Sequence, residues 1–165
     1  MKKFFSFPNP VNDLAARTVA TGVVTLSIAY LVTGWTWVLI VLTYGFWARV
    51  LTGPTMSPLG QLATRVIAPR LGEARLTAGP PKRFAQAVGV VFSSTALVLA
   101  LTAGVGPARI VIAMLLVAAS LEAFLGLCLG CKAFAILMRI GIIPESICLE
   151  CADLSRRHPQ LASRP

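Results

Sequence analysis

Charged side chains are scarce in this sequence, and acidic ones are the scarcest. Only 13% of the residues are charged, and the 6 Asp and Glu are outnumbered by 15 Lys and Arg. The single histidine, His158, lies in the polar tail, where we expect it to be solvated, so histidine-based catalysis lacks a basis. The chain also lacks paired carboxylates, a nucleophile with a base and a phosphate-binding glycine loop. These absences exclude the common soluble enzyme classes.

The positive charge does not indicate a nucleic-acid partner. The net charge is +9, but the basic residues are scattered over loops and no recognition motif accompanies them. Membrane topology and attraction to anionic lipid headgroups account for this charge better. We therefore expect the lipid bilayer, and no nucleic acid, as a partner.

Apolar residues are abundant and come in long runs. They make up 56% of the chain, and no charged residue occurs from Thr18 to Ala48 or from Phe84 to Ala108. Crossing a bilayer takes roughly 20 helical residues. Two helical hairpins fit these runs, with turns at 33–36 and 104–107 and with spans at about 14–33, 35–51, 84–103 and 107–127.

The predicted fold is all-α, an integral membrane four-helix bundle in one domain, residues 1–151, followed by a polar tail, residues 152–165. Asn12 or Asp13 should cap the first helix. In the middle loop, Ser57 and Pro58 predict the start of a helix that Pro69 ends. Its apolar face suits a helix in the membrane surface, and packing on the bundle is the alternative.

Lys and Arg collect before the first span, between the second and third, and after the fourth, whereas the two hairpin turns contain only Arg109. Since short loops rich in these residues stay in the cytoplasm, we expect both termini and the middle loop there. The inverted orientation stays open. Pro8, Pro10 and Arg17 interrupt the apolar core that a signal peptide needs, so the first helix should stay attached.

All four cysteines fall within a Cys-rich segment, residues 128–151, as two Cys-x-x-Cys pairs. The pairs are Cys128 with Cys131 and Cys148 with Cys151. This spacing is typical of a zinc site, in which four thiolates surround the metal. A Cys-x-x-Cys pair can also exchange electrons. The cytoplasm disfavours structural disulfides, so metal binding and redox exchange both stay open, beside the plain alternative of small apolar residues at a helix end.

Glu122 is the second candidate, because acidic residues inside a membrane are often functional. It precedes Cys128 by six residues and shares no helix face with it, so coupling would require a break at Gly126 or Gly130. The alternative is a structural ion pair with Arg17 or Arg49.

Three stretches resemble a bacterial membrane family catalogued as domain of unknown function 4395. They are Val11–Leu14, Leu121–Phe124 leading to Cys128–Cys131, and Ile143–Pro144 with Cys148 and Cys151. The resemblance runs from about Asn9 to Cys151. It implies a multi-pass protein of the bacterial inner (plasma) membrane, a companion of thioredoxin-like and sulfurtransferase proteins in sulfur or thiol metabolism.

These observations lead to three hypotheses. The first is a thiol-disulfide or sulfur relay through the four cysteines, with a soluble thioredoxin-like or sulfurtransferase partner. The second is a non-enzymatic scaffold in which the same cysteines bind zinc. The third is a transporter for a small sulfur species that uses Glu122. Whether the chain is an enzyme or a homo-oligomer, and what its substrate is, stays open.

Overall fold

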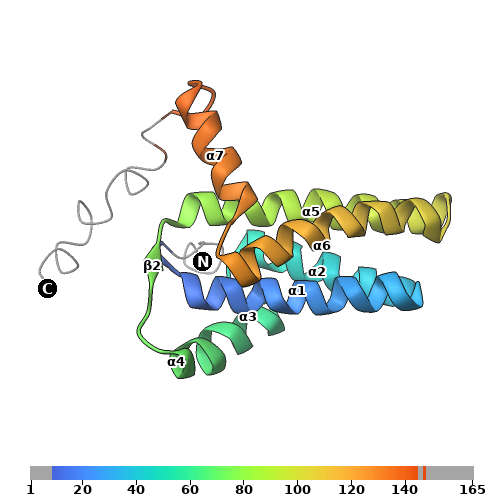
Figure 1. Ribbon diagram of the computed structural model, residues 1–165, viewed down its shortest axis with the longest axis horizontal. Helices are drawn as coiled ribbons and strands as arrows, with labels where there is room; N and C mark the ends of the chain where they lie inside the picture. The colour runs from blue at the N-terminus through green and yellow to red at the C-terminus, as the bar shows by residue number, and fades with distance from the viewer. Residues whose placement is uncertain (1–8, 145–146, 148–165) are drawn as a thin grey trace, which may run out of the picture.

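The computed structural model describes residues 9–144 and residue 147, and four helices lie side by side in it (Figure 1). They are α1 (Asp13–Thr33), α2 (Thr36–Thr52), α5 (Gly79–Thr102) and α6 (Val105–Leu125). Helix α1 packs on α6, α2 packs on α5, and α5 and α6 pack together. We call the end where α1 and α5 begin the cysteine end, and the opposite end the hairpin end.

Three of these helices, α1, α5 and α6, are long and apolar enough to cross a membrane, as expected of a membrane protein. Helix α2 is apolar but shorter, with 17 residues. Many large apolar side chains on the outer faces are exposed, among them Val32, Leu101 and Ile110. Such a surface suits lipid rather than water.

The predicted hairpin turns are present at the hairpin end. Helix α1 ends at Gly34, whose φ of 69° is left-handed and whose N–H donates to the Tyr30 carbonyl at 2.7 Å. Gly104, with a φ of 91°, separates α5 from α6. Glycine adopts both conformations without a Cβ clash.

Two predicted helix starts are wrong, and proline is the reason for both. Helix α5 begins at Gly79 instead of Phe84, because Pro80 and Pro81 fit the first turn, where backbone N–H groups lack helical partners. Helix α6 begins at Val105, before Pro107, for the same reason. The earlier start of α5 places Lys82 inside the helix.

The middle-loop helix begins as predicted but does not stop at Pro69. Ser57 Oγ accepts the Gly60 N–H at 3.2 Å, which confirms the cap. Helix α3 (Pro58–Leu62) then continues through a π-helical segment η1 (Ala63–Ile67) into α4 (Ala68–Leu71). The wider π turn ends at Ile67, two residues before Pro69, and accommodates a residue that has no N–H. The whole segment packs against α1, where Leu59 covers Gly22.

A short strand pair, which the sequence analysis did not predict, ties the starts of α1 and α5 together. Strands β1 (Val11–Asn12) and β2 (Leu76–Thr77) are antiparallel. The Asp13 N–H also donates to the Arg75 carbonyl at 2.7 Å. Asn12 Oδ1 accepts the Leu14 N–H at 3.0 Å, which confirms the predicted cap of α1. This clamp sets the relative height of the two helices at the cysteine end.

A stripe of small residues on α5, at 85, 89 and 93, permits close helix contact. A Cβ atom at Gly89 would overlap the Phe46 ring of α2. Ser93, one turn further along, is fully buried. The stripe therefore serves packing, which is how small residues act in membrane helices.

Candidate functional site

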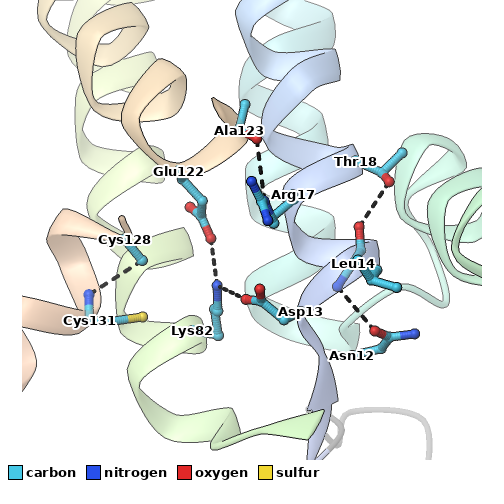
Figure 2. A network of polar contacts seen from close by, with 10 residues as sticks. All are labelled: Asn12, Asp13, Leu14, Arg17, Thr18, Lys82, Glu122, Ala123, Cys128 and Cys131. Carbon is cyan, nitrogen blue, oxygen red and sulfur yellow. Dashed lines mark hydrogen bonds and ion pairs between the residues drawn. The ribbon is translucent and has the colours of Figure 1, made fainter. Parts of the chain in front are cut away.

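Cys128 and Cys131 lie at the start of α7 (Leu129–Arg139), a helix that leaves the other four at a steep angle (Figure 1). Both are free cysteines. The helix begins at Leu129, and Cys128 is its N-cap. The Cys131 N–H donates to Cys128 Sγ at 3.4 Å (Figure 2).

The chain break that coupling between Glu122 and Cys128 would require lies at Gly126. Its φ of 67° ends α6, and its N–H donates to the Glu122 carbonyl at 3.1 Å. The Leu127 N–H donates to the Leu121 carbonyl at 3.0 Å, which completes a glycine-based helix end. The chain turns back there, so that Glu122 and Cys128 line the same cavity of about 100 Å³.

Helix α7 rests on α5 through the third residue of the Cys-x-x-Cys sequence. A Cβ atom at Gly130 would lie 2.6 Å from Ala85 Cα, so only glycine fits this contact. One turn further along α7, the Phe134 ring packs on Phe84, with ring centroids 5.7 Å apart. Glycine within the cysteine sequence thus brings both thiols close to the start of α5.

Lys82 joins two carboxylates beside the thiols (Figure 2). Its Nζ lies 2.7 Å from Glu122 Oε1 and 3.0 Å from Asp13 Oδ1, and its side chain is only 7% exposed. Three helices, α1, α5 and α6, each contribute one residue to this cluster. A buried charge of this kind is stable only when it is paired.

Glu122 is therefore part of an ion pair, but the two partners expected from the sequence were wrong. Arg17 instead donates from Nη2 to the Phe124 carbonyl at 2.9 Å and so covers the C-terminal end of α6. Arg49 donates from Nε to Gln86 Oε1 at 2.8 Å. Lys82 takes their place because α5 starts earlier than predicted.

The two thiols have opposite pKa shifts. Hydrogen bonding from Cys131 lowers the pKa of the Cys128 thiol, although burial and Glu122 act against this effect, and Lys82 supports it. The pKa of the Cys131 thiol is raised, because that thiol serves as the donor and is itself partly desolvated. Cys128, at a helix N-terminus, is thus the thiol of the pair that ionises more readily. It is buried, whereas Cys131 is half-buried.

Sequence reasoning missed the roles of Asp13 and Lys82. It treated Asp13 as a cap and Lys82 as a topology signal. A usable signal was present in the sequence: each lies near the end of a predicted span that is expected on the same side as Glu122. Opposite charges at one depth are expected to pair when their helices are neighbours.

The second cysteine pair, Cys148 and Cys151, lies outside the described residues, as does His158. Within residues 9–144, no group of three or more His, Cys, Asp or Glu could hold a metal ion. Cys128 and Cys131 supply two of the four ligands of a zinc site, so the zinc hypothesis depends on the second pair.

A family model described as Domain of unknown function (DUF4395) matches residues 11–139, which confirms the resemblance found in the sequence. No curated protein and no solved structure matches the chain.

Proposed function

The chain belongs to the family Domain of unknown function (DUF4395), and we propose that it is a membrane-embedded thiol-disulfide or sulfur relay. The observation that carries this proposal is the position of Cys128 as the N-cap of α7, with Cys131 one turn away. Helix N-termini stabilise thiolates, and paired thiols at such a position exchange disulfides readily. A soluble thioredoxin-like or sulfurtransferase protein is the proposed partner.

The exposures of the two cysteines suggest the order of the reaction. In the oxidised relay, a partner thiolate attacks the sulfur of Cys131, the more exposed residue, and the Cys128–Cys131 bond breaks. Cys128 leaves as a thiolate, which its lowered pKa favours. The second partner thiol then attacks the mixed disulfide and releases Cys131, which takes up a proton. The partner becomes a disulfide and the relay a dithiol, so two electrons have moved.

In the proposed membrane arrangement the chain crosses four times. Helices α1, α5 and α6 make three of the crossings, and α2 makes the remaining one. Helices α1 and α5 both begin at the cysteine end, so the chain must return from the hairpin end between them. Helix α2 makes this return along α5. Its 17 residues rise about 25 Å, close to the thickness of the apolar layer. The segment α3–α4 would lie near the inner membrane surface, beside α1.

The proposed orientation puts the cysteine end in the cytoplasm of a bacterial cell. Lys132 and Arg139 of α7, together with Arg65 and Arg70 of the middle loop, lie at this end, whereas Arg109 is the basic residue near the hairpin turns. Loops rich in Lys and Arg favour the cytoplasm. Both thiols would then face reduced soluble partners.

Thiol counting and metal analysis on the detergent-purified full chain test the relay. We expect no bound metal, and an oxidised protein that accepts electrons from reduced thioredoxin. Cys128→Ser and Cys131→Ser should each abolish this transfer, and the double variant Cys148→Ser/Cys151→Ser shows whether the second pair takes part. Retained transfer in both single variants contradicts the proposal.

The same experiment tests the zinc scaffold, which the spacing of the two pairs supports. That alternative expects about one zinc per chain and thiols that react only after chelation. Such a result would replace the relay with a structural site.

A further inference from the structure

Arg49, in the last turn of α2, is a buried cation that meets no carboxylate within the described residues. The residue is 5% exposed. Both ion pairs of the described part of the chain belong to Lys82. Burying a charge without a counter-charge is unfavourable, so this arginine requires an explanation.

The hydrogen bonds of Arg49 leave part of its guanidinium unused. Nε donates to Gln86 Oε1 at 2.8 Å, and Nη1 donates to Ser57 Oγ at 3.3 Å. The guanidinium carbon lies 4.6 Å from the centre of the Phe46 ring. The buried Nη2 atom has no hydrogen-bond partner among the described residues. Neutral partners hold the group in place without neutralising it.

A cavity of about 280 Å³ lies beside this arginine, between α1, α2, α3 and α5. Its charged lining residues are Arg49 and Lys82, both cations, and Asn12, Thr64 and Gln86 are polar. Most of the remaining wall is apolar, as at Ala15, Val19 and Leu76. The carboxylates that pair with Lys82 are not among the lining residues. The cavity therefore combines an unneutralised positive charge with an apolar interior.

We propose that this cavity binds an amphiphilic anion, whose oxygen-bearing acidic group pairs with Arg49 and whose acyl chain fills the apolar part. A carboxylate or phosphate oxygen at the Arg49 guanidinium would make a strong charge-assisted hydrogen bond. Binding sites of this kind typically join an apolar pocket to a few polar groups that orient the ligand. A free fatty acid and an anionic phospholipid both provide this chemistry. The site is separate from the thiols and does not depend on the relay.

The test uses the full chain in nanodiscs of phosphatidylcholine, with decanoate as the probe and decanol as its uncharged match. Saturating decanoate should raise the melting temperature by about 5 °C, and decanol should not. Arg49→Gln should abolish the rise, whereas Arg65→Gln, an exposed arginine of η1, should keep it. Thr64→Trp, at an exposed residue of the cavity wall, should also block binding while leaving Arg49 in place, which covers the case that Arg49→Gln does not fold.

A second set of nanodiscs, containing phosphatidylglycerol, identifies the source of the anion. An Arg49-dependent rise with decanoate supports a free fatty acid, and an Arg49-dependent rise only with phosphatidylglycerol supports a phospholipid. Equal shifts with decanoate and decanol overturn the pairing with Arg49. If neither set of nanodiscs shows an Arg49-dependent shift, the proposal is overturned.

Discussion

Lys82 forms both ion pairs of the described residues. It pairs with Asp13 and Glu122, which come from two other helices, and after the Cys131 hydrogen bond it also contributes to the lowered pKa of the Cys128 thiol. Breaking a buried ion pair by removing one partner costs more than the pair itself contributes, because the remaining charge stays buried. Removal of the Lys82 ammonium would leave the carboxylates of Asp13 and Glu122 without their cation.

Lys82→Gln should therefore destabilise the protein by roughly 3 kcal/mol, measured by unfolding in detergent. The matched control is Lys132→Gln, because Lys132 is an exposed lysine on α7 and its loss should change little. Adding Glu122→Gln to Lys82→Gln should restore part of the stability. Equal stability of the Lys82 and Lys132 variants would contradict the ion-pair assignment.

At the residue scale, the sequence revealed what could be read along one helix. Asn12 as a cap, Ser57 as a cap and Gly126 as a break follow from local backbone chemistry. The partner of Glu122 could not be read in this way, because it depends on which helices are neighbours. Hydropathy predicts how deep in the membrane a charged residue lies, but it does not predict which residue of another helix lies next to it.

At the scale of elements, the contact between α7 and α5 depends on one glycine. A Cβ atom at Gly130 would meet the backbone of Ala85, which cannot rotate away. Cys128 is buried and lines one cavity together with Gly130 and Ala85.

Gly130→Ala should push α7 away from α5, lower the free energy of unfolding by about 1–3 kcal/mol and speed alkylation of Cys128. Gly106→Ala is the control, since a Cβ there meets open space at the start of α6. Thiol alkylation followed by mass spectrometry measures the effect. Unchanged alkylation of Cys128 would mean that α7 does not depend on this contact.

Helices were easier to predict than their ends. The apolar runs are long enough to identify α1, α5 and α6 as spans, and the Gly34 turn separates α2 from α1. In the middle loop, Pro69 was taken as a stop, although proline is tolerated beside a π-helical segment. The predicted start of α5 followed the charge-free run from Phe84, whereas the helix begins five residues earlier, with Pro80 and Pro81 in its first turn.

At the scale of the whole molecule, the proposed orientation can be tested with cysteines at opposite ends. In a variant with all four native cysteines changed to serine, Gly106→Cys marks the hairpin end and Lys132→Cys marks the cysteine end. A membrane-impermeant maleimide added to intact cells should label only the hairpin end, because the positive residues hold the other end inside. The reverse pattern would establish the inverted orientation.

The cluster of Asp13, Lys82 and Glu122 also bears on how the protein is made. During synthesis, α1 and α2 emerge first, while Lys82 and Glu122 belong to the hairpin that follows. Asp13 has no described ion-pair partner until Lys82 arrives, and Lys82 gains its second carboxylate only when α6 is complete. A chain that stops after its first hairpin therefore lacks both ion pairs of Lys82. Such an unfinished chain differs from the assembled protein by an unpaired charge at Asp13 and by an α1 surface that α6 does not yet cover.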